Sequence, residues 1–513
     1  MDFALLCTRV YTLFLLVLLY SPCMHVRSPI DLNPLNSILE TPTEASVDYG
    51  RIIFNSPAAI LRPKSPKDIS LLLGFLSSSS SNKYLTVAAR GAGHSIYGQA
   101  QASGGIVIEM DSLPSSIKIH RWGDGDKIIS YADVSGGTLW IELLEESLKL
   151  GLAPRSWTDY LYLSIGGTLS NAGISGQAFK YGPQISNVLQ LDIITGEGEL
   201  VTCSPSKSSE LFYAALGGLG QFGIITSARI ILQEAPKKVT WVKAFYSDFD
   251  LFTKDQEMLI SMPEKVDYVE GFIVLNEKNF HNSFAAFPSL DSMIPKLEKG
   301  ILSEVYYCIE FTVYDYQPKD SNVKQVVEDI SREMSYIPSL IYTVEVSYYD
   351  FLNRVSIEEK SLRERGMWDV SHPWLNILVP KSGIEEFKDL LLEIISPDQE
   401  FEGLILIYPL LRDKWATNTS AVLPESDEVV YIVGILRSAN PSDRLSDILR
   451  ENCRMAKAAA GNQAIRAKQY LPHYHSQEQW KEHFGSGWEQ FAGRKLRFDP
   501  RNVLGPGQGI FPN

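Results

Sequence analysis

A glycine-rich turn, Ala89-Arg-Gly-Ala-Gly-His-Ser-Ile-Tyr-Gly-Gln99, is the feature that most constrains the fold of this chain. It follows an apolar run at residues 84–88 that is typical of a strand. Gly91 and Gly93 have no side chains, so the backbone can pass close to a ligand and point N–H groups at it. His94 would then be held against that ligand. On the turn alone, a surface loop with an incidental histidine is the more common case.

Length and charge limit the class of protein. A chain of 513 residues is too long for one ordinary core, so two domains are expected. An apolar content of 45% and a charged content of 21% are typical of a globular protein. The net charge of −14 argues against nucleic acid or an anionic membrane as a partner.

The pattern of elements changes along the chain. In the glycine-rich part, residues 50–235, strands are expected at 106–110, 128–134 and 190–194, and helices at 69–76 and 138–150. From about residue 239 to 465, aromatic strands and amphipathic helices replace this pattern, with examples at 268–274, 305–313 and 385–395. The last forty or so residues are too irregular to stand alone, so we expect them to pack back on the first domain.

The N-terminus carries an apolar stretch, residues 4–20, in which Arg9 is the only positive charge. It is short for a membrane span and predicts a secretory signal peptide over residues 1–25, with an uncleaved signal anchor as the alternative. Asn418-Thr-Ser420 is an acceptable N-glycosylation sequence, which makes a secreted glycoprotein the expectation.

One motif is misleading. Gly218-Leu-Gly-Gln-Phe-Gly223 matches the glycine pattern of dinucleotide-binding folds, which requires a strand before the glycines and a helix after them. Here the order is reversed, because 211–216 favours a helix and 224–232 a strand. A nicotinamide site is therefore not predicted, although close backbone approach to a phosphate stays open.

Three further segments carry candidate chemistry. Asp159 lies in Trp157-Thr-Asp-Tyr160, and a carboxylate held among aromatic rings is partly desolvated, which is typical of a general base. The alternative is a helix-capping or turn aspartate. Trp374 could fill the core or stack on a planar ligand. His473 and His475 have no third ligand nearby in sequence, so no metal site is predicted.

Together these motifs resemble one family. From about residue 45 to the C-terminus, the chain is similar to the cytokinin dehydrogenases (cytokinin oxidases), plant flavoproteins of the vanillyl-alcohol-oxidase type with a PCMH-type FAD domain. The most specific matching pieces are Trp157-Thr-Asp-Tyr160, His372-Pro-Trp-Leu-Asn376, Tyr470-Leu-Pro-His-Tyr474 and Pro506-Gly-Gln508.

The resemblance implies an α+β fold: a PCMH-type FAD-binding domain over residues 45–235 and an inserted α+β substrate-binding cap domain over 236–468. Residues 469–513 would return to the FAD domain. The implied reaction is oxidative cleavage of the N6-isoprenoid side chain of an adenine cytokinin, giving adenine and an unsaturated aldehyde. The electron acceptor would be a quinone or oxygen. The protein would be a monomer outside the cell, in the vacuole or in the endoplasmic reticulum, with no nucleic-acid partner and no membrane after signal removal.

The resemblance also implies roles for residues. His94 would hold FAD covalently, Asp159 would be the catalytic base and contact both FAD and substrate, and Trp374 would stack on the substrate. The other expected FAD contacts are Ala89, Gly91, Ala92, Gly93, Ser95, Gln99, Ser164, Ser170, Ile174, Ile225, Tyr470, Gly505 and Gln508. Two positions depart from the family pattern: Ala92 stands where an arginine is frequent, and Gly505 where serine or alanine is common.

Two alternatives remain at this point. Another covalent-flavin oxidase of the same superfamily could act on a carbohydrate or an alkaloid, but its berberine-bridge-like branch usually adds a cysteine tether, and residues 157–176 contain no cysteine. A flavin-fold protein that only binds cytokinin is the other alternative, and the intact His94 and Asp159 count against it.

Overall fold

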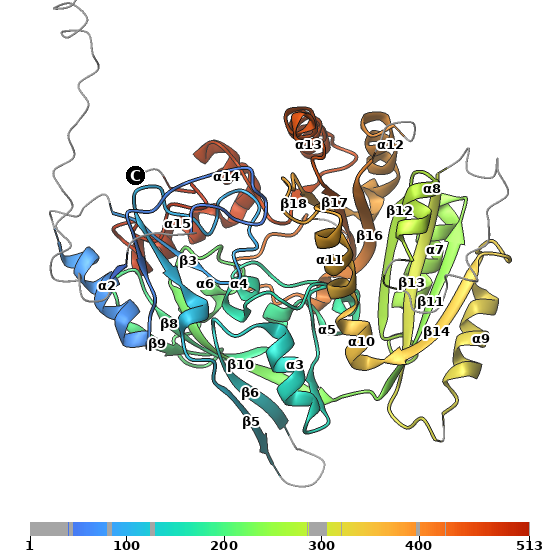
Figure 1. Cartoon of the computed structure of the whole chain (residues 1–513), viewed down its shortest axis with the longest axis horizontal. Helices are drawn as coiled ribbons and strands as arrows, with labels where there is room; N and C mark the ends of the chain where they lie inside the picture. Colours follow the sequence, from blue (N-terminus) through green and yellow to red (C-terminus); the bar gives the residue numbers. More distant parts are fainter. Residues whose placement is uncertain are drawn as a thin grey trace, which may run out of the picture.

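The computed structural model describes residues 39–40, 45–79, 85–123, 129–284, 286, 305–319, 321–396, 401–425 and 427–511. These form three β-sheets with helices around them (Figure 1). The predicted signal peptide, residues 1–25, lies outside the described residues. Within the described ranges, no helix is both long and apolar enough to cross a membrane.

The first sheet positions the glycine-rich turn. Its strand order is β1 (Leu39–Glu40), β2 (Ala59–Leu61), β4 (Ile106–Glu109) and β3 (Val87–Arg90). β2 and β3 both run parallel to β4, and α2 (Pro66–Ser78) packs its apolar residues against these strands. The strand predicted at 84–88 is found at Val87–Arg90, and the chain enters the glycine-rich turn directly after Arg90.

The second sheet is antiparallel and follows the order β5 (Ile117–Trp122), β6 (Ile129–Ser135), β10 (Ile224–Glu234), β8 (Val188–Ile194) and β9 (Leu200–Cys203), with β7 (Leu152–Pro154) beside β10. α3 (Trp140–Leu148) is shorter than the predicted helix and ends before Gly151, whose φ of 67° favours glycine. α6 (Ser209–Ala215) precedes residues 217–223, and β10 follows them. This confirms the reversed order that excluded a dinucleotide fingerprint.

The third sheet forms the second half of the molecule, and all its neighbouring strands are antiparallel. Its order is β14 (Ile341–Ser347), β11 (Lys238–Tyr246), β13 (Tyr306–Asp315), β12 (Tyr268–Val274), β16 (Gly403–Leu411), β17 (Val429–Arg437), β15 (Leu375–Pro380) and β18 (Lys468–Gln469). The strands predicted at 268–274 and 305–313 are confirmed here.

Each face of this sheet has a different neighbour. One face packs against α7 (Phe249–Ile260), α9 (Val323–Glu333), α12 (Ile384–Ile394) and α13 (Leu445–Gly461). Because side chains alternate along a strand, the other face points toward the first half of the molecule. α10 (Tyr348–Leu352) and α11 (Arg354–Glu364) lie on that side, between the two halves (Figure 1).

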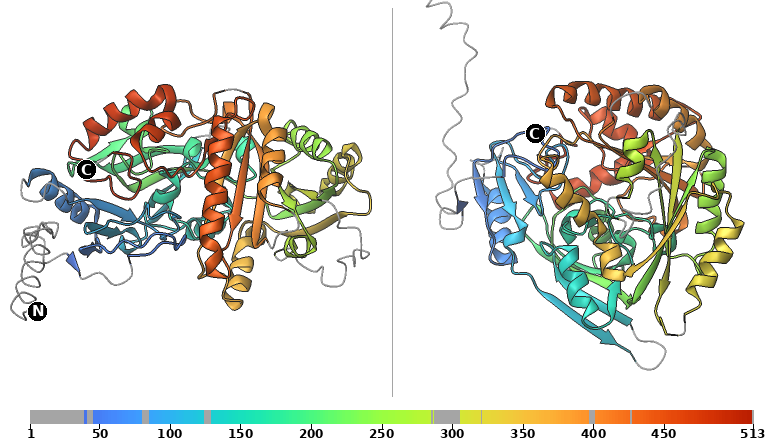
Figure 2. Two further views of the ribbon diagram at one scale, coloured as in Figure 1. Left: turned by 90° about the horizontal axis from the view of Figure 1, so that it is seen from above. Right: turned by 45° about the vertical axis from the view of Figure 1, so that its right-hand side comes forward.

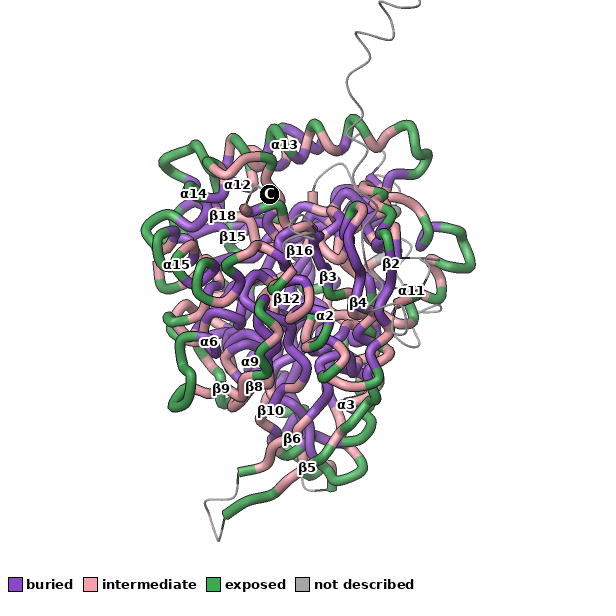
Figure 3. Tube along the Cα trace, turned by 90° about the vertical axis from the view of Figure 1, so that its left-hand side faces the viewer, coloured by how far each residue is buried: buried purple, intermediate pink, exposed green. Residues whose placement is uncertain are grey.

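The C-terminal segment packs against the first half, where α14 (Gln477–Phe484) and α15 (Trp488–Phe498) lie beside its strands (Figure 2). The Val87 N–H donates to the Val503 carbonyl at 2.7 Å, and the Gly196 N–H to the Phe498 carbonyl at 2.8 Å. Buried residues run through the centre of the molecule, whereas the β5–β6 hairpin extends outward from it (Figure 3). The short helices α4 (Ile165–Leu169), α5 (Ala178–Tyr181) and α8 (Glu277–Asn282) complete the fold.

Candidate active site

A cavity of about 610 Å³ lies between the two halves, in the size range of ligand pockets. Its walls come from the glycine-rich turn, the segment after Trp157, the open face of the third sheet, α11 and the C-terminal tail. All of the predicted site residues except Gly505 line it: Ala89, Gly91, Ala92, Gly93, His94, Ser95, Gln99, Asp159, Ser164, Ser170, Ile174, Ile225, Trp374, Tyr470 and Gln508.

One wall of the cavity is built mainly from backbone. A Cβ added at Gly91 would lie 1.9 Å from Ser164 Oγ, and one added at Gly507 would lie 1.9 Å from the Gln99 carbonyl oxygen. Segments far apart in the chain therefore approach each other only because these positions are glycine. Gln508 Oε1 is buried without a hydrogen-bond partner, so a donor on a ligand can reach it. This wall fits a flat cofactor with polar edges, such as FAD.

Gly505 is the exception: it does not line the cavity, and its cofactor contact stays a prediction. The residue is buried, and a Cβ there would meet the Asn502 side chain at 2.4 Å. Its neighbours Leu504 and Pro506 line the cavity, while Gly505 faces back into its own loop. Similarity of a motif does not tell which of its residues point toward the ligand. Ala92, the other departure from the family pattern, does line the cavity.

His94 belongs to an aromatic stack at the edge of the backbone wall. Its ring lies 3.9 Å from the ring of Tyr49 at an interplanar angle of 13°, and Tyr49 stacks in turn on His372 at 4.3 Å and 3°. Burial, followed by the charges of His372 and Arg363, lowers the pKa of His94 to about 3. The imidazole is therefore neutral at physiological pH, and one ring nitrogen has a free lone pair.

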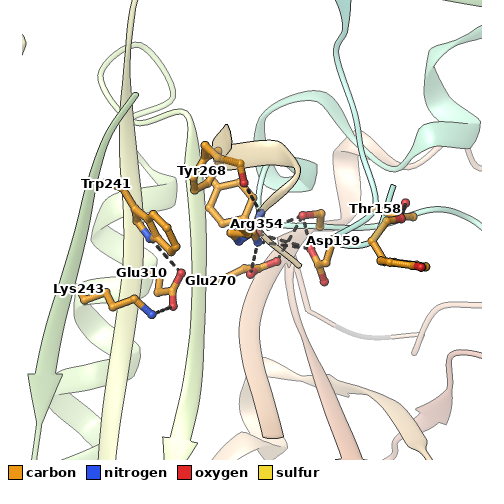
Figure 4. Close-up of polar contacts among 11 residues, drawn as sticks. Thr158, Asp159, Trp241, Lys243, Tyr268, Glu270, Glu310 and Arg354 are labelled. Atoms are coloured by element: carbon orange, nitrogen blue, oxygen red, sulfur yellow. Dashed lines mark hydrogen bonds and ion pairs between the residues drawn. The ribbon is translucent and has the colours of Figure 1, made fainter. Parts of the chain in front are cut away.

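Asp159 lies among polar groups rather than among the aromatic rings that the sequence suggested (Figure 4). The Ser175 hydroxyl donates to its Oδ1, and the Tyr268 hydroxyl lies 3.5 Å from the same oxygen. Neighbouring side chains diverge from it: the Trp157 indole donates to the Tyr348 hydroxyl at 3.1 Å, and the Tyr160 hydroxyl donates to a carboxylate on α11 at 2.6 Å. The side chains of Trp157 and Tyr160 thus bond elsewhere, and the aromatic residue that reaches Asp159 is Tyr268.

Arg354 connects Asp159 to a second carboxyl group. Its guanidinium lies 3.9 Å from Asp159 Oδ1 and 3.2 Å from Glu270 Oε2 (Figure 4). Burial lowers the pKa of Arg354, but the neighbouring Tyr268, Glu270 and Asp159 raise it by more, so the net shift is upward. Burial and then the charge of Asp159 raise the pKa of Glu270 well above its ordinary value. Arg354 thus lies between two carboxyl groups, and burial favours the neutral form of Glu270.

A row of charged side chains continues across the sheet. Glu270 on β12 is in register with Glu310 on β13, which is in register with Lys243 on β11. Lys243 forms an ion pair with Glu310, and the Trp241 indole donates to Glu310 at 3.0 Å (Figure 4). Each of the three charged residues is at most 7% exposed.

Sequence reasoning missed this row and Arg354. The available signal was one charged residue in the middle of each apolar strand: Lys243 in 238–246, Glu270 in 268–274 and Glu310 in 306–315. Charged residues are almost never buried unless they are paired, so each of them implied a partner.

Trp374 directly precedes β15 and lines the cavity while half-buried. Its ring meets the ring of Tyr49 at 5.2 Å and an interplanar angle of 66°. Stacking of Trp374 on a planar molecule in the cavity stays a prediction. His473 stacks on Tyr97 at 4.5 Å. Among the residues that the structure describes, no group of three metal-ligating side chains is found.

Comparison with known proteins places the chain in a family. A family model described as cytokinin dehydrogenase 1, FAD and cytokinin binding, matches residues 236–511, and one described as an FAD binding domain matches residues 57–204. The chain is 64% identical to cytokinin dehydrogenase 3 of Oryza sativa subsp. japonica, over 100% of this chain and 97% of that protein. It is 48% identical to cytokinin dehydrogenase 1 of Arabidopsis thaliana, over 90% of this chain and 80% of that protein.

A solved structure shares the fold. The crystal structure of a VAO-type flavoprotein from Myceliophthora thermophila C1 aligns with a TM-score of 0.63 at 16% identity, covering 89% of this chain and 80% of that one. The family models thus define an FAD-binding protein, and its fold is shared by a VAO-type flavoprotein. We call the backbone wall the FAD side of the cavity and the open face of the third sheet the substrate side. The chain belongs to the cytokinin dehydrogenase family of FAD-dependent oxidoreductases. This confirms the predicted family, cofactor and α+β fold class.

Proposed function

We propose that the chain oxidises the secondary amine of an N6-isoprenoid adenine in this cavity. The C–N single bond loses two electrons and two protons to become an imine, and water then cleaves the imine to adenine and an unsaturated aldehyde. When bound, FAD accepts the hydride. The observation that carries the proposal is the position of Asp159, which lines the same cavity as the glycine-rich wall and the charged face of the sheet.

Asp159 is the proposed base that takes the amine proton. Removing this proton strengthens the nitrogen lone pair, which stabilises the positive charge that develops on the neighbouring carbon. Ser175 and Tyr268 hold Asp159 Oδ1, and Arg354 balances its charge. Burial raises the pKa of the neighbouring Glu270, which favours its neutral form beside Asp159.

His94 and Trp374 have separate proposed roles, one toward the cofactor and one toward the substrate. The neutral imidazole of His94 can form a covalent bond to FAD, and the half-exposed ring of Trp374 can stack on the adenine. The lining residues of the backbone wall would hold the rest of the cofactor, with Gln508 Oε1 accepting one hydrogen bond.

The cellular setting is also a proposal. The apolar residues 4–20 and the exposed Asn418 support a secreted, glycosylated protein, found outside the cell, in the vacuole or in the endoplasmic reticulum. A quinone or oxygen would take the electrons from the reduced enzyme. N-terminal sequencing of the protein purified from plant tissue tests the first part, and a mature protein that starts at Met1 would contradict it.

Asp159→Asn is the experiment that tests the function. The amide keeps the shape and cannot accept the proton, so flavin reduction by isopentenyladenine should slow by about 10²–10⁴-fold, the usual contribution of a general base. Stopped-flow bleaching of the flavin measures this step. Re-oxidation by an acceptor does not involve the amine and is the internal control. If the variant bleached as fast as the parent protein, another residue would be the base.

A further inference from the structure

Residues 48–51 form a bridge between the flavin side and the substrate side of the cavity. On the flavin side, the N–H groups of Tyr49 and Gly50 donate to the carbonyls of Gly93 and Ser95 at 2.9 and 3.0 Å. On the other side, the His372 N–H donates to the Gly50 carbonyl at 2.9 Å. The bridge therefore holds the turn that contains His94 directly against the loop that leads to Trp374.

Asp48 and Arg51 secure the two ends of this bridge. Asp48 Oδ2 accepts hydrogen bonds from the Ser95 hydroxyl at 2.8 Å and the Gly98 N–H at 2.7 Å. Arg51 forms an ion pair with Asp369 at 2.6 Å. Side-chain and backbone contacts thus fix the position of Tyr49 from both sides.

Tyr49 is the central ring of the cluster that this bridge creates. Its two faces are covered by nearly parallel rings, His94 on one side and His372 on the other. Its edge meets Trp374 at 5.2 Å and an angle of 66°, and Trp368 lies 5.0 Å away. A histidine ring that packs face-to-face on a held neighbour cannot rotate freely, so the direction of its nitrogen lone pair is defined.

We infer that Tyr49 is a positioning residue that orients His94 for covalent attachment of FAD and, through its edge, holds Trp374 in the substrate site. The inference rests on the proposed attachment at His94. Attachment replaces an N–H of His94 and a C–H of a flavin methyl group by a C–N bond. The two electrons and two protons that are released pass to the acceptor that serves turnover, oxygen or a quinone. Orientation of the attacking nitrogen is a large part of the rate of such a step.

Tyr49→Leu and Tyr49→Phe separate the ring from the hydroxyl group. Both variants and the parent protein are purified with FAD and precipitated in acid, and flavin is measured in the pellet (covalent) and in the supernatant (released). With Phe the ring stack remains, so the pellet should keep the parent level of flavin. With Leu the stack is lost, so pelleted flavin should fall by about fivefold or more while total FAD stays within about twofold. The KM for isopentenyladenine should also rise in Tyr49→Leu and stay at the parent value in Tyr49→Phe.

Tyr97→Leu is the matched control, because Tyr97 lies in the same turn and stacks on a different histidine, His473. We expect it to keep its covalent flavin. His372→Ala is a second test that leaves Tyr49 in place and removes the outer ring of the stack, together with the hydrogen bonds of His372 to Ser438 and to the Trp368 carbonyl. Its covalent fraction should lie between those of the parent protein and Tyr49→Leu.

Each contrary result has a distinct meaning. Parent-level covalent flavin in both Tyr49→Leu and His372→Ala would overturn the role of Tyr49. An equal loss in Tyr49→Phe or in Tyr97→Leu would overturn ring stacking as the cause. A parent protein that releases all its flavin in acid would overturn the attachment at His94, and with it the inference.

Discussion

The two walls of the cavity are built in opposite ways. The FAD side is lined largely by backbone, with glycines such as Gly91 and Gly507 where chain segments touch. The substrate side is a sheet face that carries the buried ion pair of Lys243 and Glu310, with Glu270 in the same row. The first wall depends on the absence of side chains, and the second on buried charges that are paired with each other. A change of volume should therefore damage the first wall, and a change of charge the second.

The largest effect should come from breaking the row of charges. Lys243→Met leaves Glu310 buried without its cation, which costs about 3–5 kcal/mol in the free energy of unfolding. Lys238→Met is the matched control, because Lys238 lies on the same strand and pairs with Glu345 on the surface. An exposed pair contributes about 0–1 kcal/mol. Urea unfolding of both variants measures the difference.

A double variant sharpens this test. Lys243→Met combined with Glu310→Gln removes both charges, so it should recover much of the stability lost in the single variant. Equal stability of Lys243→Met and Lys238→Met would show that the charges on the substrate wall do not depend on each other.

The same difference explains what the sequence could predict. The backbone wall comes from contiguous motifs, 89–99 and 157–176, whose glycines and small residues are visible in a single stretch. Gly505 shows the limit even there, because its orientation depends on Asn502. On the other wall β11, β12 and β13 each contribute one charged residue to the row, and strand order and register decide that Lys243 meets Glu310.

Asp159 and Tyr49 show the same limit in two further ways. The motif identified Asp159, but the groups around its carboxylate, Ser175, Tyr268 and Arg354, come from distant segments. Tyr49 lies outside every motif and becomes significant only through its stacked neighbours. A local pattern predicts which residue is present, while its partners depend on the tertiary fold.

The two sides should also respond to opposite changes of pH. On the FAD side, burial first and then the charge of Lys468 lower the pKa of His483 in α14 to about 3. The unfolded chain binds a proton near pH 6.5, so stability is lost as the pH falls from about 6.5 toward 3. On the substrate side, the pKa of Glu270 is shifted in the opposite direction, because it is raised in the folded protein. Its contribution to the free energy of unfolding is therefore lost as the pH rises above the ordinary pKa of glutamate.

His483→Phe tests the acid side of this contrast. Keeping His483 neutral at pH 5 should lower the free energy of unfolding by about 2 kcal/mol relative to neutral pH. A phenylalanine of similar shape should remove that loss. The readout is the difference between the unfolding free energies at pH 7 and pH 5. The same substitution at the exposed His281 is the control. If both variants kept the acid sensitivity of the parent protein, His483 would not be its source.

The smallest effect should come from adding one carbon to the backbone wall. In Gly507→Ala the new Cβ would lie 1.9 Å from the Gln99 carbonyl oxygen, so one of the two segments must move. Gln508 follows directly, and its unpaired Oε1 would be displaced from the cofactor. We expect about tenfold weaker FAD binding, equivalent to about 1.4 kcal/mol, which appears as a lower ratio of flavin to protein at a limiting FAD supply.

Gly493→Ala is the control for this change, because Gly493 lies in α15 and a Cβ there meets nothing within 4 Å. Alanine in a helix is more stable than glycine by about 1 kcal/mol, so this variant should bind FAD normally and unfold at a slightly higher temperature. If Gly507→Ala bound FAD as well as Gly493→Ala, the backbone wall would tolerate added volume. The two walls would then differ only in charge. The absence of a side chain at Gly507 would not be what fits the FAD side to its cofactor.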